Sequence, residues 1–155
     1  MPFQIHAISP TLFAPLFALS DTELASRKAR RMTVTEHPGT PCRVSLADAQ
    51  IGETVLLLNH WHLPSQSPYA ASHAIFVRQG VQQARPTPGE VPEVLLSRLI
   101  SLRVFDDSDM MIHADAVEGT ALPEALTEAL GLPGAEYIHL HYAKPGCFAA
   151  SVTRA

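Results

Sequence analysis

Charged residues are scarce in this sequence, and long apolar runs are missing from it. Asp, Glu, Lys and Arg make up 17% of the 155 residues, less than the usual quarter. The formal net charge is −4, which argues against nucleic-acid binding because that function needs many cations to neutralise phosphates. No stretch approaches the run of about 18 apolar residues that a membrane-spanning helix needs, so no membrane partner is expected.

Cysteine is also rare, with only Cys42 and Cys147 in the chain. The N-terminus has no charged region ahead of its apolar stretch, and Pro10 and Pro15 interrupt that stretch, so a secretory signal is not expected. We therefore expect a cytoplasmic protein in which both thiols are reduced. A disulfide between them stays open for an exported protein and depends on their Cα separation.

Apolar residues make up 46% of the chain, which is enough for a hydrophobic core, and the length matches one domain spanning residues 1–155. Thirteen prolines are expected in turns and at the starts of elements, because proline fixes φ and lacks an N–H donor. No G-x-G-x-x-G or P-loop spacing is present.

Alternation and capping signals predict an α+β fold with a mixed or largely antiparallel sheet and a few short helices. Ser9 with Pro10, and Ser20 with Glu23, are typical helix starts, and Thr120 is expected to cap the last predicted helix. The predicted helices are 9–19, 20–30, 92–100 and 120–131, and the predicted strands are 3–8, 31–37, 53–61, 73–79, 101–106, 110–117, 135–143 and 147–153. One central sheet is expected to hold 53–61, 73–79, 135–143 and 147–153, with 120–131 packed on it.

A basic run, Arg27, Lys28, Arg30 and Arg31, is expected in the last turn of the second helix, where cations suit the helix dipole. The acidic stretch "DDSD" at 106–109 lacks the glycine and the distal glutamate of a calcium loop. It predicts a hairpin turn instead, because Asp and Ser side chains bond their own backbone.

The stretch "YIHLHYAKPGC" at 137–147 carries the densest chemistry in the sequence. His139 and His141 lie two apart on a predicted strand, so they share one face with Tyr137. With a third ligand from "HWH" (60–62), "HAD" (113–115) or Cys147, they could hold Zn²⁺. However, the glutamate that follows H-x-H in cupin-like sites is missing, and no H-E-x-x-H or C-x-x-C occurs. The favoured interpretation is a half-exposed polar face without a metal or cofactor.

Cys147 could react as a nucleophile only if a cation, an imidazole or a helix N-terminus stabilised its thiolate. Lys144 and His141 are near it in sequence, but Cys147 opens a predicted strand and not a helix. The sequence therefore favours a small buried apolar role for this residue.

Three arginines, Arg43, Arg78 and Arg103, lie in or beside apolar strand-like segments. A buried guanidinium is costly unless it is paired, and its planar fork suits carboxylates and phosphates. Two explanations stay open: internal pairing with Asp48, Asp106, Asp107 or Asp109, or a small pocket that binds an anion.

Five blocks carry a resemblance: "PCRVSL" (41–46), "GETVLLL" (52–58), "SHAIFVR" (72–78), "SLRVFDDSDMM" (101–111) and "HYAKPGC" (141–147). In this order they resemble a bacterial family known only as domain of unknown function 1203. The resemblance implies a stand-alone bacterial domain and brings no established activity. It places Arg43, Arg78, Arg103 and Cys147 on the family's motif positions.

These observations lead to two main hypotheses of function. The favoured one is a ligand-binding domain that holds a small anionic molecule through Arg43, Arg78, Arg103 and Cys147. The alternative is a metal- or thiol-dependent enzyme centred on His139, His141 and Cys147, and a purely structural interaction protein is a third reading.

Overall fold

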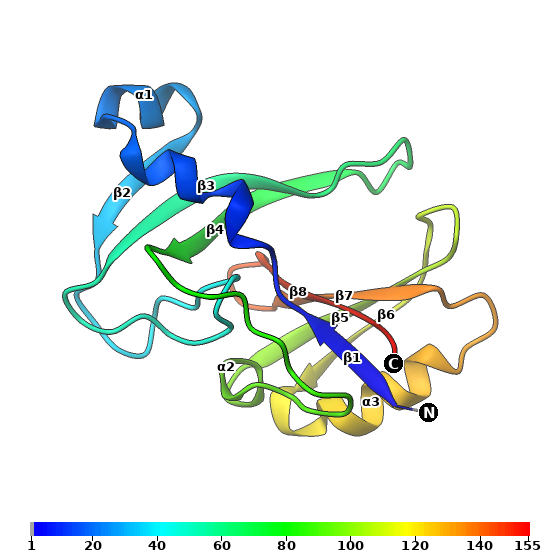
Figure 1. Ribbon diagram of the computed structural model, residues 1–155. Coiled ribbons are helices and arrows are strands. Elements are labelled where there is room, and N and C mark those ends of the chain that lie inside the picture. The colour runs from blue at the N-terminus through cyan, green and yellow to red at the C-terminus, as the bar shows by residue number, and fades with distance from the viewer. Residues whose placement is uncertain (1) are drawn as a thin grey trace.

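The computed structural model describes residues 2–155 and contains two antiparallel sheets (Figure 1). The larger sheet has the strand order β1-β8-β7-β5-β6, and the smaller one has the order β2-β3-β4. The strands are β1 (Phe3–His6), β2 (Ala29–Thr33), β3 (Thr54–Leu63), β4 (Ala71–Arg78), β5 (Leu99–Phe105), β6 (Met111–Glu118), β7 (Tyr137–Tyr142) and β8 (Phe148–Arg154). The predicted α+β class is confirmed.

Short helices connect and cover these sheets. They are the 3₁₀ helices η1 (Pro10–Leu12), η2 (Ala14–Ala18) and η3 (Gly119–Ala121), and the α-helices α1 (Asp21–Ser26), α2 (Glu93–Leu96) and α3 (Leu122–Leu130). The amino and carboxyl termini lie close together because β1 pairs with β8, with Phe3 opposite Arg154 (Figure 1).

The prediction of one central sheet is wrong, although its hairpins are right. β3 pairs with β4, and β7 pairs with β8, but these two hairpins lie in different sheets. The outer edge of β7 is taken by β5, with Leu102 opposite Leu140, so β3 and β4 cannot join it there. Alternation identifies a strand and its hairpin partner, whereas the choice of neighbour across a long connection is a tertiary outcome.

Two predicted helices are much shorter than expected. Segment 9–19 forms two 3₁₀ turns separated at Phe13, with Pro15 at the start of the second, although Ser9 caps the first as predicted. Segment 92–100 gives one turn that ends at Leu96, and its last residues belong to β5. Thr120 does not cap α3: it lies in η3, and Ala121 precedes α3 without a side-chain cap bond.

Helix α1 begins at the predicted capping box. The Ser20 Oγ accepts from the Glu23 amide, and the Glu23 carboxylate accepts from the Ser20 amide. The helix ends at Ser26, earlier than expected, so the predicted place of the basic run in its last turn is wrong. Arg31 lies on β2 and pairs with Asp21 at 2.6 Å.

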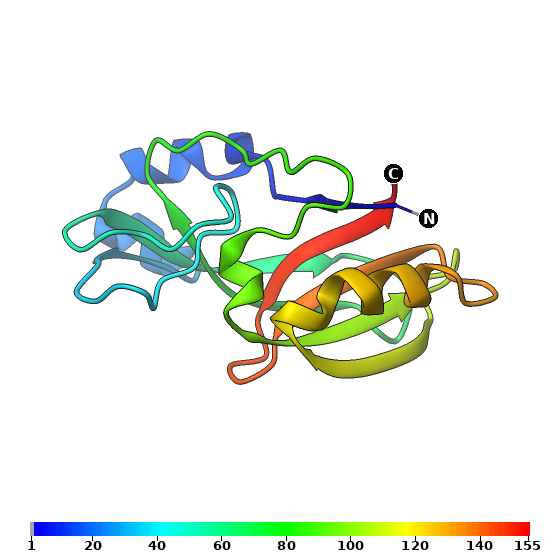
Figure 2. The ribbon, with the colours of Figure 1, turned by 90° about the horizontal axis from the view of Figure 1, so that it is seen from below.

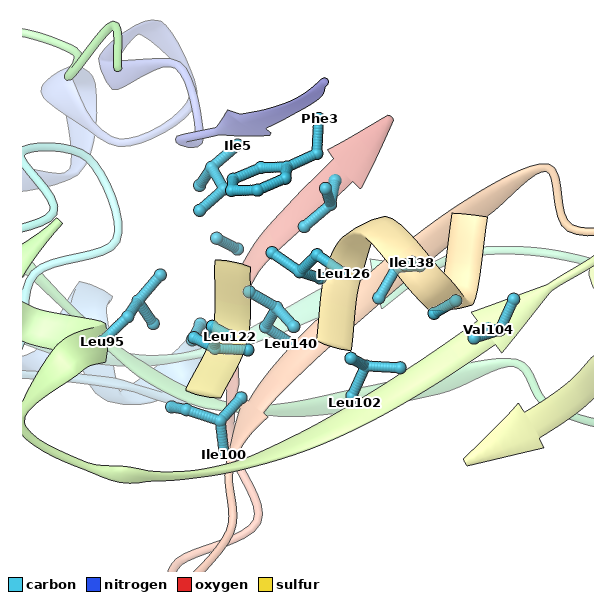
Figure 3. Close-up of a cluster of buried hydrophobic side chains, with 14 of the residues drawn as sticks. Phe3, Ile5, Leu95, Ile100, Leu102, Val104, Leu122, Leu126, Ile138 and Leu140 are labelled. Carbon is cyan, nitrogen blue, oxygen red and sulfur yellow. The ribbon is translucent and has the colours of Figure 1, made fainter. Parts of the chain in front are cut away.

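The main hydrophobic core lies between the five-stranded sheet and α3 (Figure 2). Leu122 and Leu126 of α3 lie over the apolar side chains of β5 and β7, as Figure 3 shows. The predicted packing of segment 120–131 on a sheet is therefore confirmed. A second cluster covers one face of the smaller sheet, where Leu56 and Ile75 pack against Phe13 and Leu24.

Among the described residues, no helix is both long enough and apolar enough to cross a membrane.

Gly119 is required where η3 follows β6. A Cβ at this position would stand 1.9 Å from the carbonyl oxygen of Leu95 and 2.6 Å from that of Leu96, and both are backbone atoms. We expect Gly119→Ala to lower the free energy of unfolding by about 3 kcal/mol, because a packed backbone cannot yield that far.

The control is Gly131→Ala at the end of α3. A Cβ there would meet the Glu128 carbonyl oxygen at 3.3 Å, so a cost below about 1 kcal/mol is expected. Urea denaturation of both variants measures the difference, and equal stabilities would contradict the packing at Gly119.

Candidate functional site

A cavity of about 650 Å³ lies between the smaller sheet and one end of the larger sheet. Leu57 of β3 and Phe76 of β4 contribute apolar wall, and the turn between β7 and β8 closes another side. This volume is in the range of pockets that hold small organic molecules. The full lining is Gly39, Pro41, Leu57, His73, Ala74, Phe76, Ser97, Arg98, Leu99, Glu118, Tyr142, Ala143, Lys144, Pro145 and Cys147.

Arg43 is buried beside this cavity, with 1% of its surface exposed. Its Nε donates to the Phe148 carbonyl at 2.7 Å, and its Nη1 donates to the Pro41 carbonyl. Its Nη2 donates to the Sγ of Cys147 at 2.8 Å. Among residues 2–155, none of these partners is a carboxylate, so the guanidinium is held by two carbonyls and one sulfur.

Tyr142 at the end of β7 has two guanidinium groups near its ring. The Cζ of Arg43 is 4.9 Å from the ring centroid, and the Cζ of Arg98 is 5.3 Å from it. Both distances suit cation–π attraction. Arg98 is matched by Asp48 through two bonds of 3.1 and 2.7 Å, so Asp48 is already engaged as its counter-ion.

The Tyr142 hydroxyl is the least satisfied polar group of the cavity wall. The residue is 3% exposed, and its Oη is buried without a hydrogen-bond partner in the described chain. Burial raises the pKa of Tyr142 to about 12, so the group is a neutral O–H donor at physiological pH. A buried donor that lacks a partner costs about 1–3 kcal/mol, so this hydroxyl is an unmet hydrogen-bond donor in a residue of the cavity wall.

The three arginines singled out from the sequence do not share one pocket. Arg78 forms a two-bond pair with Glu53 at 2.9 and 3.0 Å and also reaches Ser45. The hydrogen bond from Arg78 holds the pKa of the Glu53 carboxyl below its usual value. Arg78 therefore has an internal partner that the sequence interpretation did not name.

Arg103 lies on the opposite side of β5 from the α3 core and has no acidic partner in the described chain. Its Nε donates a hydrogen bond to the Ser101 hydroxyl at 3.2 Å. Burial lowers the pKa of this guanidinium below its ordinary value. In the strand register Arg103 stands opposite His139, which places it in a histidine cluster.

His139 and His141 are 6% and 2% exposed, so the predicted half-exposed face is wrong. The far end of β3 covers them: the His62 ring centroid lies 5.9 Å from that of His139 and 4.9 Å from that of His141. Phe148 stacks on His62 at 5.2 Å. Strand β7 is therefore buried on both faces, which the alternating pattern of one strand could not reveal.

These three histidines are neutral at physiological pH. Burial lowers the pKa of His62 and of His139 to about 4, and that of His141 to about 3. The charge of Arg103 contributes to the lowered pKa of all three. The Nδ1 of His141 is 2.9 Å from the Gly146 carbonyl, which fixes its proton on Nδ1.

The cluster does not form a metal-binding ligand set. Within residues 2–155, no three imidazole, thiol or carboxylate groups are placed so that they could hold one metal ion. His62 comes from the predicted "HWH", while His113 and Asp115 of "HAD" are exposed on β6. His60 contacts Phe13 instead, with ring centroids 5.7 Å apart.

Sequence reasoning missed Arg98 and the roles of Tyr142 and Lys144. Arg98 follows the single turn of α2, and nothing in its local pattern distinguishes it from a surface arginine. Tyr142 and Lys144 had a usable signal, because both flank the turn before Cys147 and a hairpin turn brings its neighbours together. Neither cysteine forms a disulfide in the structure, and both are buried.

The buried histidines predict an acid-sensitive fold. Their folded-state pKa values lie below the unfolded value near 6.5, so the unfolded chain binds protons first as the pH falls. Stability that is complete above about pH 6.5 should be lost between that pH and about pH 4 for His139, and down to about pH 3 for His141. At pH 5 the loss should be about 2 kcal/mol for each of His139 and His141.

The measurement is urea denaturation from pH 7.5 to pH 4.5. His141→Asn keeps an N–H donor for the Gly146 carbonyl and removes one titrating group. The free energy of unfolding of this variant should therefore fall less steeply as the pH is lowered. His113→Asn on the exposed face of β6 is the control and should follow the wild type. A pH-independent unfolding energy in the wild type would contradict the neutral cluster.

Arg103→Gln tests the electrostatic part of this cluster. Removing the positive charge should raise the pKa of His62, His139 and His141, because that charge opposes their protonation. Histidine proton resonances followed by NMR should titrate at higher pH, and acid unfolding should begin at lower pH. At pH 7 the change in unfolding free energy should stay within about 1 kcal/mol. Unshifted titrations would show that Arg103 does not face the histidines.

Comparison with curated proteins and with solved structures finds no match. A family model described as a protein of unknown function (DUF1203) matches residues 39–154. The matched range contains the whole cavity lining, Arg43 and the histidine cluster. Because the match covers most of the chain, the protein belongs to the DUF1203 family.

Proposed function

We propose that this protein binds a small organic anion, a carboxylate or a phosphate ester, in the cavity beside Cys147. The proposal keeps the favoured hypothesis from the sequence but changes its residues. Arg98, Lys144 and Tyr142 replace Arg78 and Arg103, because Arg78 is paired with Glu53 and Arg103 does not line the cavity.

The unpartnered Tyr142 hydroxyl carries the proposal. Tyr142 lines a cavity large enough for a ligand, its hydroxyl is a buried neutral donor without a partner, and an anionic oxygen would be a strong acceptor for it. The charges nearby favour the same ligand. Lys144 lines the wall and forms no ion pair among residues 2–155, so its charge is available to a ligand.

The rest of the wall indicates an apolar body for the ligand. Leu57, Phe76 and Leu99 contribute apolar surface to the cavity. Sites for small molecules commonly combine such apolar walls with a few polar groups that fix orientation. An aromatic or aliphatic acid fits this combination better than a bare inorganic anion does.

Isothermal titration calorimetry with benzoate, phenyl phosphate and neutral benzamide tests the proposal. The two anions should bind and benzamide should not. Lys144→Ala should weaken anion binding about three- to tenfold, because the exposed Lys144 side chain supplies about 1 kcal/mol of attraction. Arg85→Ala removes the same charge from an exposed site outside the cavity and should bind like the wild type.

Tyr142→Phe separates a ligand-binding role from a structural one. Removing the unpartnered hydroxyl should stabilise the free protein by about 1 kcal/mol, because a buried unsatisfied donor disappears. The same substitution should weaken anion binding by about fivefold or more, because it removes a donor to the ligand. Binding of benzamide as tight as that of benzoate, or unchanged affinity in both variants, would overturn the proposal.

A further inference from the structure

Arg43 has a buried positive charge that no carboxylate of residues 2–155 balances. Its three hydrogen-bond acceptors are the carbonyls of Pro41 and Phe148 and the sulfur of Cys147. The neighbouring carboxylate, Asp48, is held by both Nη atoms of Arg98. A buried ion without a counter-ion is strongly unfavourable, so an anion is expected within reach of Arg43.

The sulfur of Cys147 is placed to be that anion. A guanidinium can only donate, so Sγ is the acceptor in the 2.8 Å contact with Nη2. A thiolate is a far better acceptor than a thiol, and an adjacent arginine is one of the features that stabilise it. The guanidinium of Arg98 also lies near the Tyr142 ring, but Asp48 balances its charge, so Arg43 is the cation without a carboxylate partner.

Cys147 also has access to a ligand. It is 7% exposed and lines the same cavity as Tyr142, a residue that is 3% exposed and whose hydroxyl has no hydrogen-bond partner in the described chain. The other cysteine provides a contrast inside the same chain. Cys42 is fully buried, lies outside the cavity lining, and its Sγ accepts only backbone amides, those of Val44, Ser45 and Arg78, at 3.3–3.4 Å.

We propose that Cys147 is a nucleophilic thiolate, with Arg43 as its counter-ion, that attacks an electrophilic carbon of the anion bound in this cavity. In the step, the sulfur electron pair forms an S–C bond, and the leaving group departs with the electrons of its bond to that carbon. One negative charge is lost from sulfur, and one leaves with the leaving group. The inference rests on the proposed function, because the anionic group of the substrate is held by the same cavity.

Alkylation with iodoacetate and iodoacetamide tests both the thiolate at Cys147 and the binding of an anionic group beside it. Either reagent forms an S–C bond and releases iodide, but only iodoacetate carries a carboxylate. Peptide mass spectrometry at pH 6 and pH 8 should find Cys147 modified and Cys42 unmodified in the native protein. The rate at Cys147 should change less than about threefold between these pH values, whereas an ordinary thiol with a pKa near 8.5 gains about 50-fold or more.

The ratio of the two reagents tests anion binding separately. Relative to the ratio measured with free glutathione, Cys147 should prefer iodoacetate by about fivefold or more, and Lys144→Ala should reduce that preference without changing the pH profile. An alkylation rate that hardly changes with pH, without a preference for iodoacetate, would support the thiolate but would overturn the anion site. A steep pH profile would overturn the thiolate, whichever reagent is preferred.

Substitution of the buried Arg43 can unfold the chain, so a second measurement uses a milder change. The ultraviolet absorbance difference near 240 nm between the wild type and Cys147→Ser should report one thiolate at pH 7, and it should vanish in acid. Where they fold, Arg43→Lys should retain fast alkylation at pH 6 and Arg43→Gln should lose it. The absence of a thiolate signal at pH 7 would refute the inference even if neither Arg43 variant folds.

Discussion

The buried guanidinium of Arg43 is the interaction on which the rest of this structure depends. Its side chain donates to Phe148 at the start of β8 and to Cys147 just before that strand. Its backbone amide donates to the Phe76 carbonyl of β4, and its own carbonyl accepts from the Ile8 amide. One residue therefore ties the N-terminal segment, the smaller sheet and the β7–β8 hairpin to one point. Because a guanidinium has five donors in a fixed plane, it sets the relative orientation of these segments as well as their distance.

The five-stranded sheet is buried on two faces that differ in chemistry. One face carries Leu102 and Leu140 against α3, where burial of apolar surface stabilises the fold. The other carries His139, His141 and Arg103 beneath the end of β3. The buried Nδ1 atoms of His62 and His139 have no hydrogen-bond partner in the described chain, and protonation of the rings adds a further cost. The stability of the histidine face therefore depends on pH, whereas that of the apolar face against α3 does not.

The sequence predicted what depends on local pattern and missed what depends on contacts between hairpins. The strands, the α1 capping box and the turn at 106–109 follow from alternation and from Asp and Ser side chains, and the Asp106 carboxylate accepts from the Ser108 and Met110 amides. The division into two sheets and the burial of His139 depend on where β3 ends in space. The partners Glu53 and Asp48 could not be assigned either, because several carboxylates were equally plausible by residue type.

The position of Cys147 explains how a plain hairpin can carry a site. Tyr142, Lys144 and Cys147 lie within six residues, and the tight turn with Gly146 at φ 82° returns the chain so that all three line one cavity. Local sequence thus supplies the thiol, a cation and a hydroxyl donor. The charge that decides the chemistry comes from Arg43, about a hundred residues away in the chain, through the 2.8 Å contact. A search limited to the hairpin sees Lys144 and His141 beside the thiol, but His141 is neutral and bonded to Gly146, so the distant arginine is the group that matters.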